Sequence, residues 1–397
     1  MGTPAGTPTA ALLRQARRKP ESYKTAPPGC SIGAVFETAA ICGVPLFEPD
    51  ARSLAAQLAR HSEKLALLAK SVRTSNTVQA MSKFAFVFPG QGTHYVGMGM
   101  DLADHYAEAA AVFEQANEVM GMDILQLCRS GPESELVKTE NAQPTIHTTT
   151  IALLKVVESH GFCAHVTAGF SLGEYAALVY AGVLQFEDSV KLVQRRGMFM
   201  QNAVPQGVGK MCLISGLDRP AVEQIVTQAS DLGLIECSNF NCPRQIIVAG
   251  YATAVERAAE LANLRGASAT TFLNVSGPFH TSLLLGAGQQ LYELLQTIPM
   301  GQAKKKLVSN VTAQYLTCSD DIRQLLKEHV YKPVQWEGCV NTMLDDGVDT
   351  FVEIGPRHSL TTYTQMTALQ RNLKVRCLSV ENVETLEAFL REMDHAV

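Results

Sequence analysis

The sequence predicts an α/β protein with two subdomains: a large one built on a mostly parallel sheet, and a small one inserted into it. From Lys83 onward, short apolar runs alternate with longer helical segments, which is typical of a parallel sheet covered by helices. This rhythm changes over residues 206–270, where the order strand, helix, strand, strand, helix predicts a ferredoxin-like unit. A chain of 397 residues with 46% hydrophobic composition can bury cores of this size.

The individual elements are expected from short apolar runs for strands and from longer periodic segments for helices. For the large subdomain, residues 81–205 and 271–397, we expect strands at 84–88, 164–169, 305–310 and 350–355, and helices at 100–120, 144–161 and 172–182. For the small subdomain we expect strands at 209–216, 234–240 and 244–250, helices at 219–230 and 253–266, and a further strand from residues 269–275.

Residues 1–80 differ in composition and are interpreted as an N-terminal extension. Residues 1–33 are rich in Pro, Gly and Thr, which is typical of a flexible tail. Residues 49–75 place leucines at helical spacing among Lys and Arg, so we expect an amphipathic helix. Its leucine stripe could dock on the rest of the chain or on a synthase partner, or the segment could be a mere tether.

Composition and charge exclude several classes of protein. The formal net charge of −5 argues against nucleic acid or anionic membrane as a partner, and no apolar run approaches the roughly 18 residues of a membrane span. The ten cysteines include no CxxC pair, so no metal site is expected. We expect a cytoplasmic protein; five basic residues against one acid in residues 1–27 leave organellar import open.

The stretch from Gly169 to Gly173 reads GFSLG and matches the pattern G-x-S-x-G between a predicted strand and a predicted helix. In a nucleophile elbow of the α/β-hydrolase type, the serine sits on a strained turn, so the residues two before and two after it must be small. The alternative is that Ser171 only caps the following helix. The strand before it and the helix after it favour the elbow, and the large subdomain is therefore expected to be α/β-hydrolase-like.

The loop FPGQGTHYVGMG at residues 88–99 follows the first predicted strand. It has neither the Lys-Ser/Thr of a phosphate-binding loop nor the third glycine of a dinucleotide fingerprint. It could be a plain turn. It could also set the backbone N–H of Gln91 beside the elbow, as a donor to an oxyanion.

A nucleophilic serine needs a general base, and the most suggestive of the ten histidines is His280, between a predicted strand and a helix. A lone histidine is more often structural. No acidic residue stands in a convincing triad pattern, although Asp188 and Glu353 are both conceivable.

Arg195 and Arg196 adjoin on a predicted amphipathic helix, where neighbours point about 100° apart, so one of them can face inward. A buried guanidinium requires an anionic partner, and a substrate carboxylate could serve through two parallel hydrogen bonds. The alternative is an ordinary surface arginine.

Together these segments closely resemble the malonyl-CoA:acyl-carrier-protein transacylases, including the acyltransferase domains of polyketide synthases. The resemblance runs from about Ser82 to the C-terminus and excludes residues 1–80. It is carried by eight motifs in the family's order: FAFVFPGQGTHYVGMG, ENAQPTIHTTTIAL, GFSLGEYAALVYAGVL, LVQRRGMFMQNAVPQGVGKM, SNFNCPRQIIVAG, VSGPFHTSLL, YKPVQW and FVEIGP.

The resemblance implies a Ser–His dyad that needs no cofactor. Ser171 would take malonyl from coenzyme A as an ester, with His280 as general base and then general acid. The backbone N–H groups of Gln91 and Leu172 would form the oxyanion hole, and Arg196 would bind the free carboxylate. The implied partners are malonyl-CoA and an acyl carrier protein with its phosphopantetheine arm, and a monomer is expected.

The family also implies that a main-chain carbonyl, rather than a carboxylate, orients the catalytic histidine, and its position falls on His329. Met211, Asn241 and Gln245 match positions that line the acyl pocket. Phe279 resembles the malonyl-selective pattern, because a bulky ring there would crowd an α-methyl branch.

The alternatives are a thioester hydrolase using the same dyad, a transferase for a substituted malonyl unit, and a carrier-docking scaffold that has lost catalysis. Whether the pathway makes fatty acids or polyketides stays open at this point.

Overall fold

The computed structural model describes residues 83–317 and 321–394. The expectations for residues 1–80, including the amphipathic helix at 49–75, lie outside the described residues. Within the described ranges, no helix is long and apolar enough to cross a membrane. No group of three or more His, Cys, Asp or Glu side chains in these ranges could hold a metal ion.

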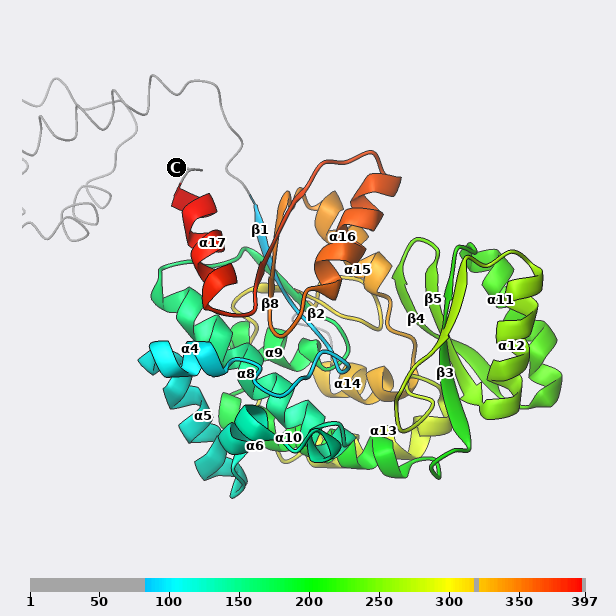
Figure 1. Ribbon diagram of the computed structural model, residues 1–397, viewed down its shortest axis with the longest axis horizontal. Helices are drawn as coiled ribbons and strands as arrows, with labels where there is room; N and C mark the ends of the chain where they lie inside the picture. Colours follow the sequence, from blue (N-terminus) through cyan, green and yellow to red (C-terminus); the bar gives the residue numbers. More distant parts are fainter. Residues whose placement is uncertain (1–82, 318–320, 395–397) are drawn as a thin grey trace, which may run out of the picture. The chain divides into compact units, whose positions relative to one another are not determined.

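The large subdomain contains a five-stranded sheet with the order β7-β2-β1-β8-β9, and all neighbouring strands are parallel (Figure 1). Its strands are β1 Phe84–Phe88, β2 Val166–Gly169, β7 Lys306–Val308, β8 Thr350–Ile354 and β9 Arg376–Val380. Four of these strands were predicted from their apolar runs. The edge strand β9 was not, because its sequence RCLSV is only partly buried and lacks a continuous apolar run.

Helices cover both faces of this sheet because successive side chains of a strand point to opposite faces. Phe86 and Phe88 of β1 belong to one hydrophobic cluster, whereas Ala85 and Val87 belong to the other. The helices of the large subdomain are α4 Met100–His105, α5 Ala107–Met120, α6 Ile124–Ser130, α7 Glu133–Leu136, α8 Thr139–Ser159, α9 Gly173–Tyr180, α10 Phe186–Asn202, α13 Leu285–Leu295, α14 Ile322–Tyr331, α15 Trp336–Asp345, α16 Ser359–Gln370 and α17 Val383–Asp394, with the 3-10 turn η3 at Ser282–Leu284. The helix expected over 100–120 is two helices, because Tyr106 between them is extended.

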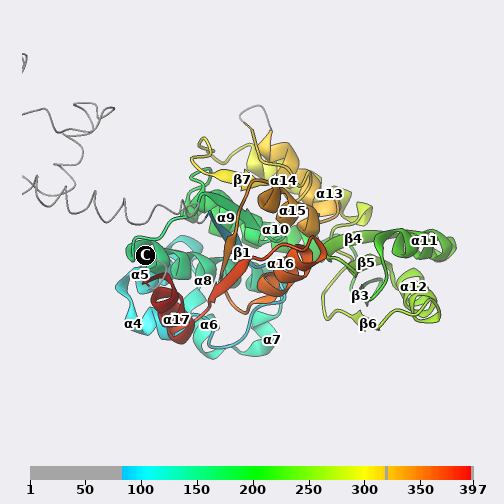
Figure 2. The same ribbon diagram turned by 90° about the horizontal axis from the view of Figure 1, so that it is seen from above.

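The small subdomain has its own antiparallel sheet with the order β4-β5-β3-β6, and it lies to one side of the parallel sheet (Figure 2). Its elements are β3 Gly209–Ser215, α11 Arg219–Ala229, η2 Ser230–Leu232, β4 Ile235–Cys242, β5 Gln245–Tyr251, α12 Ala252–Leu264 and β6 Ala269–Phe272. This βαββαβ order, with a separate hydrophobic cluster between sheet and helices, is the expected ferredoxin-like unit. The last strand is supplied by residues 269–272, so it extends two residues past the expected boundary at 270.

A short backbone link joins the two subdomains beside α14 and α15. The Phe240 N–H donates to the Val334 carbonyl at 2.9 Å, and the Val334 N–H donates to the Ser238 carbonyl at 2.9 Å. Val334 lies five residues after His329, so β4 is fixed next to the end of α14. Because the carboxyl ends of parallel strands meet at one edge, Gln91, Ser171 and Asn310 follow β1, β2 and β7 at the same edge of the large sheet.

Candidate active site

Ser171 occupies the sharp turn between β2 and α9, and its φ of 50° lies in the left-handed region. A Cβ atom on Gly169 would overlap the backbone of Gly173, and one on Gly173 would overlap the Phe88 carbonyl. The predicted need for small residues two before and two after the serine is therefore met by direct backbone contact. The Ser171 N–H donates to Asn310 Oδ1 at 2.8 Å, so the turn is held from β7 as well.

His280 lies against this serine, with its Nε2 atom 2.8 Å from Ser171 Oγ. Its Nδ1 lies 2.7 Å from the backbone carbonyl of His329, which can only accept, so Nδ1 carries the proton and Nε2 is free to accept from the hydroxyl. Burial, followed by the electrostatic effects of His329 and Arg196, holds the pKa of His280 well below its usual value. The ring is therefore neutral at physiological pH, as a general base must be.

The third member of this cluster is a carbonyl, so the two acidic residues considered from the sequence do not orient His280. Glu353 is buried, but its carboxylate accepts from the N–H groups of Leu360 and Thr361 at the start of α16. Asp188 lies in the first turn of α10 and makes no hydrogen bond to His280 within the described part of the chain.

Arg196 is buried on α10, whereas its neighbour Arg195 is exposed. Its Nη2 donates to Ser171 Oγ at 3.2 Å and its Nη1 donates to Gln143 Oε1 at 2.9 Å. Its Nε is buried without a hydrogen-bond partner, and no carboxylate among the described residues lies within ion-pairing distance. Burial lowers the pKa of this guanidinium from its usual value, and the ring of Tyr175 lies 5.4 Å away. The guanidinium is thus a buried cation that no carboxylate of the described residues contacts directly.

The backbone N–H groups of Gln91 and Leu172 have no hydrogen-bond partner among the described residues, so both can bind an oxyanion. The loop that carries Gln91 lies against the elbow, since a Cβ atom on Gly90 would come within 2.5 Å of the Phe170 carbonyl oxygen. The Gln91 side chain is fixed by a donated bond to Thr139 Oγ1 and by one accepted from Gln143, each 3.2 Å long.

The residues expected to line the acyl pocket lie at different distances from this cluster. Phe279 and Met211 are buried in the same hydrophobic cluster. Asn241 lies 3.4 Å from the hydroxyl of Tyr363, whose ring packs beside Phe170, and its buried Oδ1 has no partner. Gln245 instead contacts Met366 of α16, and in the described ranges it makes no hydrogen bond to Ser171, His280 or Arg196.

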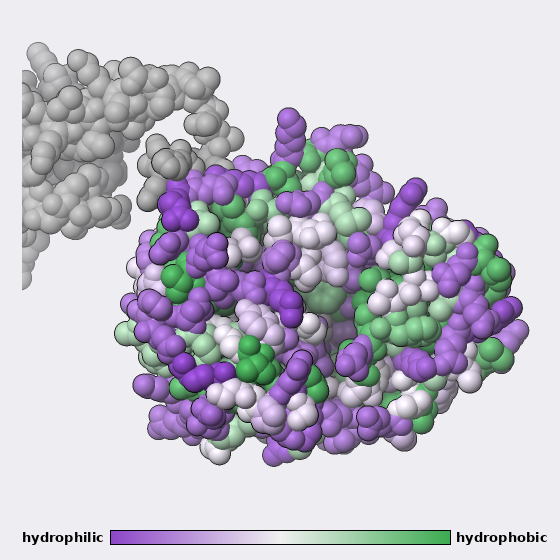
Figure 3. Space-filling view, in the orientation of Figure 1, coloured by the Kyte–Doolittle hydropathy of each residue, from purple (hydrophilic) through white to green (hydrophobic). Residues whose placement is uncertain are grey.

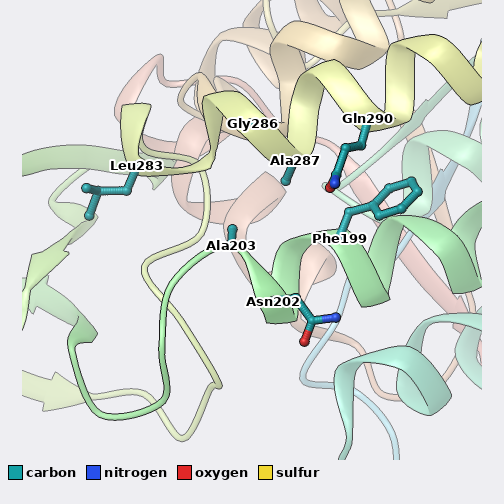
Figure 4. Close-up of a pocket in the computed structure, with 7 residues that line it drawn as sticks. All are labelled: Phe199, Asn202, Ala203, Leu283, Gly286, Ala287 and Gln290. Carbon is teal, nitrogen blue, oxygen red and sulfur yellow. The ribbon is translucent and has the colours of Figure 1, made fainter.

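The surface is hollowed where the large and small subdomains meet (Figure 3). A pocket of about 250 Å³ lies between the end of α10, which carries Arg196, and the segment that follows His280. Figure 4 shows Phe199 on α10 beside Gln290 on α13, with Ala287 on the same helix and Asn202 at the end of α10.

Comparison with known proteins decides the family. The model of the acyl transferase domain matches residues 85–394. The malonyl CoA-acyl carrier protein transacylase of Bacillus subtilis is 40% identical over 314 residues, which cover 79% of this chain and 98% of the relative. The chain belongs to the malonyl-CoA:acyl-carrier-protein transacylase family.

Solved structures of transacylases agree with this assignment. The malonyl CoA-acyl carrier protein transacylase of Clostridium perfringens has a TM-score of 0.77 at 37% identity, covering 79% of this chain and 98% of that one. A type II polyketide synthase acyl carrier protein has been solved in complex with its malonyl-transacylase. That transacylase has a TM-score of 0.75 at 35% identity, covering 78% of this chain and 100% of its own.

Three site residues of this transacylase were not found from the sequence: Gln143, Glu174 and Asn310. Gln143 lies inside the motif ENAQP, and Asn310 ends the predicted strand KKLVSN, so both positions carried a signal. Their roles depend on hydrogen bonds between residues far apart in the chain, such as the bond from Ser171 to Asn310. Sequence spacing alone cannot predict such a bond.

Proposed function

We propose that this chain transfers a malonyl group from coenzyme A to the phosphopantetheine thiol of an acyl carrier protein. The observation that carries the proposal is the buried, carboxylate-free guanidinium of Arg196, 3.2 Å from the hydroxyl of Ser171. An unpaired buried charge costs several kcal/mol, and the free carboxylate of malonyl would supply the missing partner. A plain esterase has no use for a cation beside its acyl group.

In the first half-reaction, Ser171 Oγ attacks the thioester carbonyl while His280 Nε2 takes the hydroxyl proton. The carbonyl oxygen becomes an oxyanion, which the N–H groups of Gln91 and Leu172 stabilise by roughly 3 kcal/mol per donor. The intermediate collapses with cleavage of the carbon–sulfur bond, and His280 returns the proton to the coenzyme A sulfur. The product is a malonyl ester on Ser171.

The second half-reaction repeats these steps with a different nucleophile. The phosphopantetheine thiol gives its proton to His280 and attacks the Ser171 ester, and the serine oxygen leaves with that proton. No cofactor is required, because both half-reactions exchange one acyl bond for another. The solved complex of a carrier protein with its malonyl-transacylase supports this class of partner.

Arg196 and Phe279 would choose the acyl group by different means. Arg196 can turn two N–H groups toward the malonyl carboxylate once its bond to Ser171 Oγ is released. Phe279, buried beside His280, would crowd a branch at the α-carbon. Met211 and Asn241 would close the pocket, and Gln245 would act at its edge.

The test is to incubate the protein with radiolabelled malonyl-CoA, with and without a phosphopantetheinylated carrier protein, and to follow the label. Transfer predicts label on the carrier and little free malonate. Rapid release of malonate that the carrier does not suppress would identify a hydrolase instead. Ser171→Ala serves as the inactive control.

A further inference from the structure

Glu174 is a buried carboxylate, 3% exposed, in the first turn of α9, and the acyl-transfer steps give it no role. Its Oε1 accepts the backbone N–H of Asn310 at 3.2 Å. Its Oε2 lies 2.6 Å from Nδ1 of His329, whose side chain is fully buried. One carboxylate therefore contacts two residues that each support one member of the Ser–His pair.

On the nucleophile side, Asn310 spans the elbow. Its Oδ1 accepts the Ser171 N–H at 2.8 Å, and its Nδ2 donates to the Gly169 carbonyl at 2.7 Å. Because the elbow is strained at Ser171, these two bonds help to hold a conformation that the backbone alone disfavours. Glu174 in turn fixes the backbone of Asn310.

On the base side, His329 lies in the last turn of α14, where helix carbonyls are free to accept from outside the helix. Its carbonyl accepts from His280 Nδ1 at 2.7 Å, and its ring stacks on the His280 ring at 5.2 Å between centroids. The angle of the His329–Glu174 contact is poor for a hydrogen bond. At 2.6 Å the two side chains are nevertheless in direct contact, so Glu174 packs against the ring of His329 and fixes its place.

We infer that Glu174 is a positioning residue that holds the nucleophile and the base in register, through Asn310 on one side and His329 on the other. In a Ser-His-Asp triad the carboxylate binds the catalytic histidine directly. Here a carbonyl occupies that place, and the carboxylate acts one residue further away. The inference rests on the proposed function, because acyl transfer is the reaction that Glu174 would support. The contacts that carry the inference involve other residues, namely Asn310 and His329.

Charged and titratable groups surround this pair on every side. They are His280, Arg196 on α10, Tyr175 on α9 and Cys339 on α15. Burial raises the pKa of Tyr175 to about 12 and that of the Cys339 thiol well above its usual value, so both are neutral at physiological pH. Neither of these two groups therefore changes the charge near His280 at physiological pH.

The decisive experiment measures the single-turnover rate of Ser171 acylation by malonyl-CoA. Glu174→Ala should slow acylation roughly 100-fold, the scale of a small misplacement of reacting groups, with little change in the malonyl-CoA concentration for half saturation. Glu174→Gln keeps an oxygen that accepts the Asn310 N–H and keeps the size of the side chain, and should recover most of the rate. Glu384→Ala, at an exposed first-turn position of α17, is the matched control and should react like the wild type.

The His329 variants test the other side and do not depend on Glu174→Ala folding. His329→Ala should slow acylation at least tenfold, whereas His329→Gln keeps a donor for Glu174 and should stay within about threefold. His329→Gln also removes a side chain that lowers the pKa of His280 electrostatically, so the loss of the acylation rate at low pH should begin at higher pH. If His329 had a merely structural role, its variants would contain a smaller fraction of active protein, but the pH at which the acylation rate falls would not change. Acylation within twofold of wild type in both alanine variants would overturn the inference.

Failure of the inference can be told from failure of the proposed function. A wild-type protein that malonyl-CoA does not acylate contradicts the proposed function. The labelling rate of Ser171 by a fluorophosphonate, which needs no malonyl group, then reports on the same dyad. The inference predicts that the wild type is labelled fastest, the glutamine variants more slowly and the alanine variants slowest. Equal labelling rates in all of them would overturn it.

Discussion

Nη2 of Arg196 donates a hydrogen bond to Oγ of Ser171 across 3.2 Å, with both side chains buried. The cation that would bind the substrate carboxylate therefore also contacts the nucleophile before substrate arrives. Binding of malonyl exchanges this bond for a charged pair, so the same guanidinium positions the hydroxyl and selects the acyl group.

Replacing Arg196 with Ala should lower kcat/KM for malonyl-CoA by about 10²–10⁴-fold, because breaking a buried ion pair costs about 3–5 kcal/mol. Acetyl-CoA, which has no free carboxylate, should lose far less. Both values come from steady-state transfer to the carrier protein. Arg195→Ala, next to it on α10 but exposed, is the control and should keep wild-type kinetics. An unchanged preference for malonyl in Arg196→Ala would refute the assigned role.

The pH dependence of acylation should follow His280. Its lowered pKa means that the neutral base persists below the ordinary imidazole value of about 6.5, and activity is lost only as the pH falls through the lowered value. The rate of Ser171 acylation should therefore stay flat from about pH 8 down to about pH 6.5. A rapid-quench series across this range gives the profile. An acid limb centred at or above the ordinary value would mean that His280 is not the base, or is not buried in solution.

The two glycines of the elbow should tolerate no side chain. Gly169→Ala places a methyl group on the backbone of Gly173, and we expect a loss of more than about 3 kcal/mol in the free energy of unfolding. Gly286→Ala is the matched control, because nothing lies within 4 Å of its added methyl group. In the helix α13 that change should be neutral or stabilise by up to about 1 kcal/mol. Urea unfolding measures both, and a Gly169→Ala protein as stable as wild type would contradict the close contact.

His147 on α8 should make stability depend on pH. It is fully buried against Ser189, and burial lowers its pKa to about 3. The unfolded chain binds a proton near pH 6.5 and the folded chain does not, so this contribution is lost as pH falls from about 6.5 towards 3. The loss by about pH 4.5 should be roughly 2–3 kcal/mol.

Urea midpoints measured at about pH 7 and pH 4.5 give the loss of stability between these two pH values. This loss should be smaller in His147→Gln than in the wild type. The exposed His105→Gln is the control and should behave like the wild type. Equal pH sensitivity of wild type and His147→Gln would assign the effect to other groups.

Phe279 should exclude branched acyl groups. Phe279→Ser should raise the ratio of methylmalonyl to malonyl transfer by about tenfold, since one methyl group in an apolar pocket is worth about 1–3 kcal/mol. Competition between the two thioesters for one carrier protein measures the ratio. Phe272→Ser, at a half-exposed position on β6, controls for general effects of the change. A ratio that does not move would place the selectivity elsewhere in the pocket.

The sequence predicted the features that depend on local pattern. The apolar runs gave β1, β2, β7 and β8, and the G-x-S-x-G spacing gave the elbow with its steric requirement. Adjacent arginines on one amphipathic helix gave the expectation that one faces inward, and Arg196 does. Each of these depends on residues within a few positions of one another.

The features that were missed depend on contacts between distant segments. The half-buried edge strand β9 carries no strong apolar signal. Residue patterns alone found no acidic partner of His280 because the partner is the backbone carbonyl of His329, which only the family resemblance indicated. Glu174 lies in the family motif itself, yet its contacts with Asn310 and His329 exist only because β7 and α14 meet α9 in three dimensions.

The central claim is that Ser171, beside His280 and Arg196, carries malonyl between two thiols. The most direct measurement is peptide mass spectrometry of the protein after a brief exposure to malonyl-CoA, followed by a chase with phosphopantetheinylated carrier protein. We predict a malonyl ester on the peptide containing Ser171, which disappears as the carrier gains malonyl, and no such ester in Ser171→Ala. Malonyl transfer by Ser171→Ala, or an ester on a different residue, would contradict the account.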